Sequence, residues 1–350
     1  MMPVQPLIIR RPDDWHVHLR DEQMLAAVLP ATAEIFARAI VMPNLKPPIT
    51  TAKAAAAYRA RILAALPAGQ RFTPLMTCYL TDTINTDDLT AGFRDGIWIA
   101  AKLYPAGATT NADAGVTALS RIHRTLEVLQ ALGMPLLVHG EVVASDVDVF
   151  DREAVFIERE LVPLRRDFPA LKLVFEHLTT QEGVDFVREA AGPTAATVTP
   201  HHLLINRNAM FERGLRPHAY CLPVAKREHH RRALRAAVTS GNPRFFLGTD
   251  SAPHPRHLKE HACGCAGIYN APTAMACYAQ VFAAENSLAK LEGFASRFGP
   301  QFYGLSVNND FLELSEVPAG EDAADLQTAE GEVRIFTAPG VTSWRARVLA

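Results

Sequence analysis

The sequence predicts an α/β protein whose single large core is a closed (β/α)8 barrel, the TIM-barrel architecture. Short apolar runs alternate with amphipathic stretches from end to end, which is typical of repeated βα units and a parallel sheet. Eight such runs occur at a mean spacing of about 33 residues, which suits one strand, one helix and two loops. The chain has 350 residues and 49% hydrophobic content, so it is long enough to close one barrel as one domain.

The eight predicted strands follow one another along the whole barrel region. The first apolar run, residues 7–9, leads into His18, and the last, residues 245–249, leads into Asp250. In chain order, the runs end near His18, Asn44, Leu80, Lys102, His139, His177, Pro200 and Asp250. A barrel brings the carboxyl ends of all its strands to one face, so we expect these residues to share one rim.

The stretches between the runs predict helices. Residues 51–66, dense in alanine, and residues 114–132 carry apolar side chains at helical spacing. Residues 228–238 are strongly basic, and we interpret His229 and His230 there as part of a solvated helix face rather than as metal ligands.

The βα alternation stops after about Ser306. The remainder predicts a tail helix, an acidic loop over residues 316–325 and short strands packed outside the barrel. We therefore expect one domain over residues 1–350, with the barrel at about 7–305 and a small C-terminal extension at about 306–350.

Charge and composition limit the kinds of partner. Lys and Arg total 35 against 37 for Asp and Glu, so the formal net charge of −2 supplies no long-range field for nucleic acid or an anionic membrane. No apolar run approaches the roughly 18 to 20 residues of a membrane-spanning helix, and the N-terminus lacks a signal-peptide pattern. We expect a soluble, cytoplasmic protein that acts on a small molecule and binds neither nucleic acid nor a membrane.

The five cysteines are an odd and sparse set, which predicts reduced thiols rather than a disulfide framework. Cys263 and Cys265, with His254, His257 and His261 just upstream, offer an alternative interpretation as a structural zinc site. Their one-residue gap is tighter than the usual two to four residues of such sites, so we do not favour it.

Two histidines placed two residues apart are the most informative feature of the chain. Side chains at i and i+2 of an extended strand point to the same face, so His16 and His18 can bind one cation together. Four other runs end in further candidate donors: Lys102, His139, His177 and Asp250. A lone histidine or aspartate at a strand end is more often a hydrogen-bonded structural group. The coincidence of all these donors predicts a metal-dependent enzyme.

The number of donors indicates two metals. Four histidines and an aspartate are too many for one tetrahedral zinc with an open position, but they suit two metals that share a bridging group. Lys102 as an ammonium would be repelled by two cations. Its carbamate, formed with carbon dioxide, is an anionic bidentate oxygen donor that can bridge two ions, so we expect Lys102 to be carboxylated.

Motifs over nearly the whole chain carry a family resemblance. They are the segments 13–20, 41–44, 102–105, 138–141, 176–177, 248–254 and 263–267. With them the chain resembles the amidohydrolase superfamily and, more narrowly, its dihydroorotase family, in the class that many bacteria carry as a separate small enzyme. No catalytic residue of that family's pattern is missing.

The resemblance implies reversible hydrolysis and cyclisation between (S)-dihydroorotate and N-carbamoyl-L-aspartate, a step of de novo pyrimidine (UMP) biosynthesis. It implies two Zn2+ per subunit, bridged by carboxylated Lys102 and a hydroxide. The implied ligands are His16, His18 and Asp250 for one zinc, and His139 and His177 for the other. Asp250 would take the hydroxide's proton on attack and deliver it to the leaving nitrogen.

The resemblance also implies how the substrate is held. Its carboxylate needs partners away from the metals, and the planar fork of Arg20 matches a carboxylate bidentately. The implied substrate-binding residues are Arg20, Asn44, Thr109, Thr110, His139, Leu222, His254 and Ala266, of which Leu222 and Ala266 would use main-chain groups.

Residues 105–115 follow the strand of Lys102 and are rich in small residues. One interpretation is a passive surface loop. The resemblance implies instead a lid that closes over the substrate, with Thr109 and Thr110 reaching it. The family is often dimeric, so we also expect a homodimer.

Two alternatives stay open at the level of sequence. The metal ligands alone do not name the substrate, so another cyclic amide hydrolase, such as a hydantoinase or allantoinase, is the first. Arg20, Asn44 and His254 favour an anionic substrate against it. The second is a non-catalytic barrel that scaffolds a partner, but such proteins tend to lose ligands and this chain lacks none.

Overall fold

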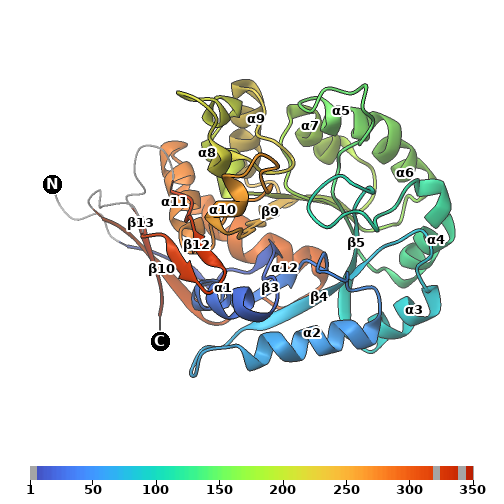
Figure 1. Ribbon diagram of the computed structural model, residues 1–350, viewed down its shortest axis with the longest axis horizontal. Coiled ribbons are helices and arrows are strands. Elements are labelled where there is room, and N and C mark those ends of the chain that lie inside the picture. The colour runs from blue at the N-terminus through green and yellow to red at the C-terminus, as the bar shows by residue number, and fades with distance from the viewer. Residues whose placement is uncertain (1–5, 318–323, 338–343, 350) are drawn as a thin grey trace.

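The computed structural model describes residues 6–317, 324–337 and 344–349, and within them eight parallel strands form one sheet in the order β2 to β9 (Figure 1). A parallel bridge between Val17 and Ser251 joins the two ends of the sheet, so the predicted (β/α)8 barrel is confirmed. The strands are β2 (Asp14–Val17), β3 (Arg38–Val41), β4 (Thr73–Tyr79), β5 (Trp98–Leu103), β6 (Leu136–Val138), β7 (Leu173–Phe175), β8 (Thr194–Val198) and β9 (Phe245–Leu247).

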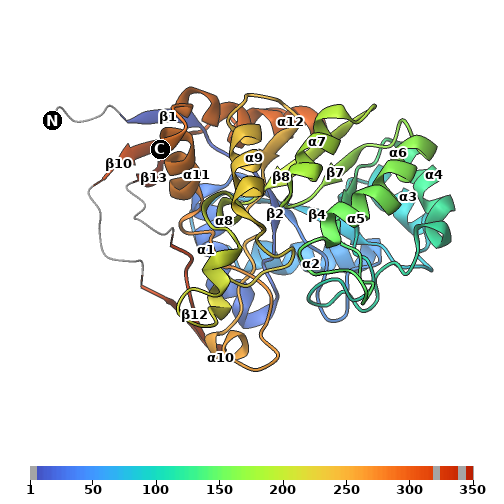
Figure 2. The same cartoon turned by 90° about the horizontal axis from the view of Figure 1, so that it is seen from above.

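Helices pack around the outside of the barrel (Figures 1 and 2). The helices are α1 (Glu22–Ile35), α2 (Ala52–Ala64), α3 (Thr86–Arg94), α4 (His123–Leu132), α5 (Arg152–Phe156), α6 (Val162–Asp167), α7 (Gln181–Glu189), α8 (Pro200–Leu204), α9 (Glu228–Val238), α10 (Arg256–Lys259), α11 (Ala274–Ala284) and α12 (Phe298–Tyr303). Helices α1, α2, α3, α7 and α8 each begin at a residue whose side chain accepts a hydrogen bond from the first turn. At α2, for example, Thr51 accepts from the Ala54 N–H, and at α7 Thr180 accepts from the Gly183 N–H.

The expected helices form at α2 and α9, but the helix expected over residues 114–132 is only partly present. Residues 119–122 form a 3-10 turn, and the α-helix α4 begins at His123. The start of the segment is bound elsewhere, because Val116 forms a bridge with Pro105 and the Thr117 N–H donates to Asp82 at 2.9 Å. Tertiary hydrogen bonds thus replace helical ones here despite the helical spacing.

The first apolar run lies outside the barrel, contrary to our expectation. Residues Leu7–Arg10 form β1, which pairs antiparallel with β10 (Phe311–Glu316). Strand β10 also pairs with β13 (Trp344–Val348), so the two ends of the chain share a small outer sheet (Figure 2). The first barrel strand is β2 instead, and it contains His16.

The predicted tail helix is also wrong for the described residues beyond Ser306. Strand β10 alternates buried and exposed positions, with Leu312 and Leu314 fully buried. That period of two is a strand pattern. Strands β11 (Leu326–Thr328) and β12 (Gly331–Val333) form a separate hairpin, which contacts α1 and α10. Most of the predicted acidic loop, residues 318–323, lies outside the described residues.

A layer of side chains fills the barrel below the predicted rim. Trp15 is fully buried and stacks on Tyr303 of α12, with ring centroids 4.6 Å apart. Gly299 allows this approach, because a Cβ there would lie 1.9 Å from the Trp15 indole nitrogen. The apolar layer closes one end of the barrel and leaves the strand carboxyl ends for polar groups.

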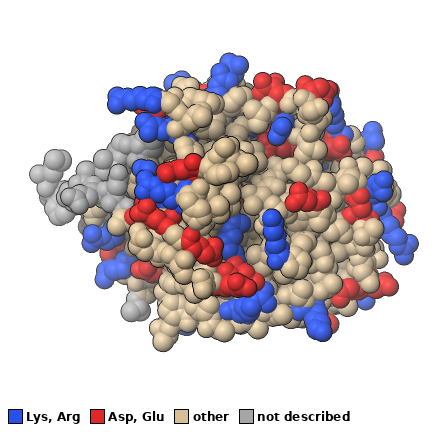
Figure 3. Space-filling view, in the orientation of Figure 1, with Lys and Arg blue, Asp and Glu red and all other residues tan. Residues whose placement is uncertain are grey.

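Figure 3 shows Lys and Arg interspersed with Asp and Glu over one face of the molecule, in line with the near-zero net charge. No helix in the described part of the chain is long and apolar enough to span a membrane.

Candidate active site

The predicted site residues meet at the carboxyl ends of the barrel strands, where barrel enzymes bind their substrates. His16 lies on β2 and Lys102 on β5, while His139, His177 and Asp250 directly or closely follow β6, β7 and β9. Predicted residues that line one shared pocket are His16, His18, Arg20, Asn44, Thr109, Thr110, His139, His177, Leu222, Asp250 and Ala266. Lys102 and His254 are buried at its edges.

Three of the predicted metal ligands form a tight group. The Asp250 Oδ1 lies 3.1 Å from the His18 Nε2 and 3.3 Å from the His16 Nε2, and the two histidine nitrogens are 3.4 Å apart. Ligand atoms of His16, His177 and Asp250 lie within 4.8 Å of one another. His139 completes the set, with its ring centroid 4.8 Å from that of His177. This convergence of nitrogen and carboxylate donors fits one or more divalent cations.

The electrostatics of these donors also fit metal binding. Burial lowers the pKa of His18 to about 4 and holds the pKa of His177 well below its usual value, so both are neutral donors at pH 7. Burial acts against the Asp250 carboxylate, but the neighbouring histidines outweigh it and hold its pKa well below the usual range. His16 differs, because Glu176 and Asp250 outweigh its burial and raise its pKa to about 8. This ring must therefore lose a proton before it can bind a cation.

Lys102 is fully buried among these groups. Its Nζ has no hydrogen-bond partner in the described chain, and its nearest carboxylate oxygen is Glu176 Oε2 at 3.6 Å. Burial lowers the pKa of Lys102, which favours the neutral amine. The neutral amine is the form that reacts with carbon dioxide, so the surroundings of Lys102 are compatible with the predicted carbamate.

In three of the four histidines, one ring nitrogen bonds a side chain that is not itself a predicted metal ligand. His16 Nδ1 bonds Glu176, His18 Nδ1 lies 3.0 Å from Asn44 Oδ1, and His139 Nε2 lies 2.9 Å from Glu141 Oε2. Such partners orient metal-binding imidazoles and fix their tautomers. Sequence reasoning assigned no role to Glu141 or Glu176, although both lie inside the motifs next to a predicted ligand, which is the signal that could have found them.

The predicted carboxylate-binding residues form a second group at the pocket. The Arg20 guanidinium donates to His254 Nε2 at 2.9 Å and to the Pro253 carbonyl at 3.2 Å. Burial holds the pKa of His254 well below its usual value, so it accepts this bond as a neutral ring. Asn44 has a role that sequence reasoning missed, because it holds His18 through its Oδ1 as well as facing the pocket.

The segment 105–115 lies over the pocket. Asn44 Nδ2 donates to the Thr110 carbonyl at 3.0 Å, and the Thr110 hydroxyl donates to the Ala266 carbonyl at 3.4 Å. The enclosed space is about 20 Å³, which is room for about one water molecule. A ring-sized substrate does not fit this space as it stands in the structure.

A buried lysine supports the opposite wall of the pocket. Lys259 Nζ donates to the carbonyls of Tyr220, Cys265 and Gly267 at 3.0, 2.9 and 2.5 Å. These bonds fix the backbone on both sides of Ala266. No sequence pattern predicts this arrangement, since a lysine in a polar segment is usually exposed.

Backbone strain concentrates at the site. Among the described non-glycine residues, seven have positive φ, and three of these are predicted site residues: Arg20 (58°), His177 (42°) and Asp250 (45°). Such conformations persist only where surrounding contacts enforce them, and they cluster at functional sites.

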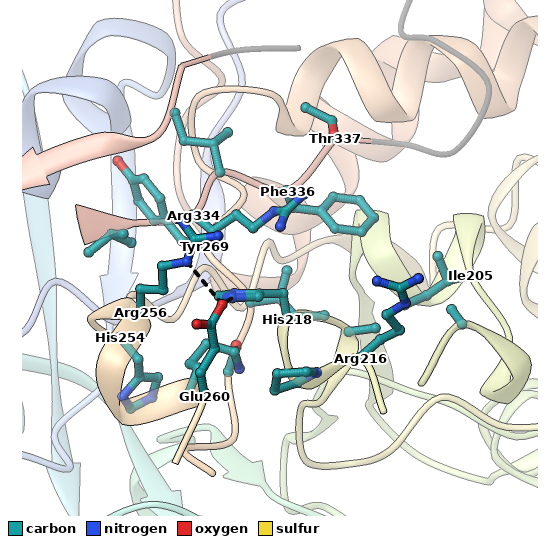
Figure 4. Close-up of a pocket in the computed structure, with 18 of the residues that line it drawn as sticks. Ile205, Arg216, His218, His254, Arg256, Glu260, Tyr269, Arg334, Phe336 and Thr337 are labelled. Carbon is teal, nitrogen blue, oxygen red and sulfur yellow. Dashed lines mark hydrogen bonds and ion pairs between the residues drawn. The ribbon is translucent and has the colours of Figure 1, made fainter. Parts of the chain in front are cut away.

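A larger pocket of about 820 Å³ adjoins the site on the far side of His254 (Figure 4). Three of its side chains form a small ion-pair group: Arg256 and His218 both contact Glu260 at 2.9 Å. Arg256 also contacts Glu332, which does not line the pocket, at 2.7 Å. It lacks the grouped donors of the smaller pocket, so size does not identify the site of chemistry here.

A second donor group lies beside the candidate site, formed by His201, His202 and Cys221, with ligand atoms within 4.8 Å of one another. Both ring nitrogens of His202 are already engaged, Nδ1 with the Thr199 hydroxyl at 2.9 Å and Nε2 with the Pro223 carbonyl at 3.0 Å. We assign no metal to this group. Cys263 and Cys265 belong to no donor group among the described residues.

Comparisons with known proteins agree with this geometry. Residues 7–309 match the model of the amidohydrolase family. A dihydroorotase of Synechococcus sp. (strain RCC307) is 61% identical over 343 residues, 97% of each chain. A crystal structure of dihydroorotase from Campylobacter jejuni superposes with a TM-score of 0.86 at 33% identity, over 99% of this chain and 98% of that one. Dihydroorotase from Saccharomyces cerevisiae, solved in complex with 5-fluoroorotic acid, gives a TM-score of 0.87 at 32% identity over 99% of both chains.

Proposed function

From the premise that this chain belongs to the amidohydrolase family and, within it, to the dihydroorotases, we propose that its rim pocket interconverts (S)-dihydroorotate and N-carbamoyl-L-aspartate. The observation that carries the proposal is the meeting of a metal-type donor group with the Arg20 and His254 pair in one small pocket. The first group suits hydrolysis of an amide, and the second suits a substrate carboxylate.

We assign two zinc ions to the donor group. His16, His18 and Asp250 would hold one, His139 and His177 the other, and the carbamate of Lys102 would bridge them. When bound, such ions acidify water and polarise a carbonyl. The orphaned Lys102 Nζ and the tightly grouped donors support the assignment.

Asp250 has the geometry and charge of the general base and acid. It is a carboxylate at neutral pH and lines the pocket, so it could accept the proton of the attacking water. The Asp250 N–H donates to the His16 carbonyl at 2.8 Å, which holds the strained backbone and aims the side chain into the pocket. The same carboxyl group then delivers the proton to the leaving ring nitrogen.

Substrate selection rests on charge. The Arg20 side chain, aligned by His254 and the Pro253 carbonyl, faces the pocket and would pair with the substrate carboxylate. Asn44, Leu222 and Ala266 complete the substrate contacts, and Thr109 and Thr110 close over the ligand. An uncharged hydantoin would give the half-buried Arg20 guanidinium no anionic partner, which disfavours the hydantoinase and allantoinase alternative.

We also keep the finer expectations of a cytoplasmic homodimer and of one domain over residues 1–350. Sedimentation at micromolar concentration tests the dimer.

The decisive experiment is a spectrophotometric dihydroorotate assay with metal content measured on the same sample. We expect turnover with two zinc ions per chain. Metal without dihydroorotate turnover, together with faster hydrolysis of uncharged hydantoins, would favour the alternative hydrolase. Absence of both metal and turnover would favour a scaffold.

A further inference from the structure

His177 differs from the other three histidines of the site. Its Nδ1 is buried and has no hydrogen-bond partner within the described residues, whereas His16, His18 and His139 each bond a side chain. Its backbone also has a φ of 42°, a conformation that L-residues rarely adopt. The orientation of its ring must therefore be set by the backbone that carries it.

The turn after β7 is held by hydrogen bonds from two sides. The His177 N–H donates to the Thr197 hydroxyl at 2.7 Å, and the Leu178 N–H donates to the Thr197 carbonyl at 3.1 Å. The next two backbone N–H groups, those of Thr179 and Thr180, donate to the carboxylate of Glu153.

Glu153 is fully buried and lies on α5, a different element from the turn that it binds. Its Oε1 accepts from the Thr180 N–H at 2.8 Å and the Thr180 hydroxyl at 2.5 Å. Its Oε2 accepts from the Thr179 N–H at 3.0 Å and the Thr179 hydroxyl at 2.5 Å. Both carboxylate oxygens are thus fully engaged by two consecutive residues, which is a strong, charge-assisted clamp.

Helix α7 packs closely against the clamp at Gly183. A Cβ at Gly183 would lie 2.9 Å from the Glu153 Oε1 and 2.8 Å from the Leu178 side chain. Gly183 therefore permits the close approach of α7 to the carboxylate. Its N–H also caps the helix on the Thr180 hydroxyl at 3.0 Å, so the clamp and the start of α7 share one residue.

We propose that Glu153 is a positioning residue for His177: it fixes the backbone just after the strained residue, so that the imidazole is presented to the metal site without a side-chain partner. The inference rests on the proposed metal site and deepens it. Glu176 and Glu141 orient His16 and His139 by bonding their rings. Glu153 would orient His177 by bonding the backbone that follows it.

The test compares Glu153→Gln with wild type and with Asp13→Asn. The glutamine keeps the size of the side chain but replaces one acceptor oxygen by an NH2 group. That group would face the N–H and the hydroxyl of Thr179 or Thr180, which are both donors. Asp13 is the matched control, because it is also a fully buried carboxylate, bound to Arg38 and Asn308 ahead of β2. Folding is monitored by circular dichroism, and zinc affinity by competition with a chelator.

We expect Glu153→Gln to weaken the zinc held with His177 by about 10- to 100-fold and leave the other zinc nearly unchanged. Saturating zinc should restore most of its kcat. Asp13→Asn should keep both affinities even if its melting temperature falls. Equal zinc affinities in Glu153→Gln and wild type would overturn the proposal and leave Glu153 a purely structural role.

A second variant covers a failure of Glu153→Gln to fold. Thr179→Val removes one hydroxyl bond to Glu153 and keeps the N–H bond, so it should weaken the same zinc by a few fold. Unchanged affinity in this variant would also count against the clamp. A wild-type chain that binds no zinc would overturn the proposed metal site itself. Two tightly bound zinc ions in every variant would leave that site standing and overturn only the role of Glu153.

Discussion

His16 and His177 lie with their ring centroids 5.1 Å apart, yet the protein orients them by different means. His16 lies in an extended strand and is held by the carboxylate of Glu176, which follows β7. His177 has a left-handed backbone, and among the described residues its Nδ1 has no hydrogen-bond partner; its turn is held by Glu153 and Thr197. The difference shows that a ligand can be fixed either at its ring or at its main chain, and that the two devices fail in different ways.

Loss of Lys102 should have the largest effect, because it removes the group proposed to join the zinc held by His16 to the zinc held by His177. Lys102→Ala should lose metal and activity together, by more than the roughly 10² to 10⁴ in rate that a missing general base removes. Added short-chain carboxylates should restore part of both by supplying the missing oxygens. Metal analysis and the dihydroorotate assay on one sample check this, and a crystal structure with metals beside a bare Lys102 ammonium would contradict it.

Asp250→Asn should separate binding from chemistry. The amide can still approach a metal but cannot shuttle a proton, so kcat should fall by about 10² to 10⁴ while the circular dichroism spectrum stays that of wild type. A kcat near wild type would move the proton transfer to another group.

Glu176→Gln and Glu141→Gln test the histidines that are held at their rings. The first weakens the bond to His16, and the second weakens the bond to His139. Each variant should lower zinc affinity by about 10- to 100-fold, Glu176→Gln at the zinc of His16 and Glu141→Gln at the zinc of His139. Chelator competition measures both. If the two variants affected the same zinc, the assignment of ligands to two separate ions would be wrong.

Thr109→Val combined with Thr110→Val tests the lid rather than the ligands. Two neutral hydrogen bonds at roughly 0.5 to 1.5 kcal/mol each give a fall in kcat/KM of about one to two orders of magnitude, with metal content unchanged. Thr117→Val is the control, because the Thr117 hydroxyl bonds Asp82 at 2.6 Å outside the pocket. Kinetics equal to those of the control would restore the passive-loop interpretation.

The smallest effect belongs to a carboxylate outside the site. Hydrogen bonds from Arg231, despite some burial, together with Asn206 and Arg232, lower the pKa of Glu228 to about 2. A lowered folded-state pKa contributes stability above the unfolded value near 4.5, and this contribution is lost as the pH falls through about 2. The side chain is 36% exposed, so solvent screening reduces the contribution to about 1 kcal/mol. Glu228→Gln should therefore be less stable than wild type in urea at pH 7, and the gap should close toward pH 2; an equal gap at both pH values would contradict the ion-pair origin.

The sequence could predict the rim of the barrel because each ligand ends an apolar run, and parallel strands deliver their ends to one face. It misplaced Leu7–Arg10, since an apolar run next to His16 looks the same whether it lies inside the barrel or beside it. Residues 114–118 carry helical spacing, but long-range hydrogen bonds override it.

Within the site, the metal-binding and substrate-binding residues could be predicted, but the hydrogen bonds that hold them in place could not. Asn44 was expected at the substrate and also holds His18, because hydrogen-bond partners far apart in the chain leave no local pattern. Glu153 could not be predicted for the same reason: its partners, the N–H and hydroxyl groups of Thr179 and Thr180, lie 26 and 27 residues away in the chain.

The pairing of β1 with β10 affects how the chain folds during its synthesis. Leu7 lies opposite Leu314, so the first strand leaves the ribosome long before its partner exists. At about 5 to 20 residues per second, the wait is roughly 15 to 60 s, during which all the barrel strands are made. The barrel can thus close while its N-terminal strand is still single, and the outer sheet fastens last. Through that interval the exposed backbone edge of β1 is open to pairing with another nascent chain.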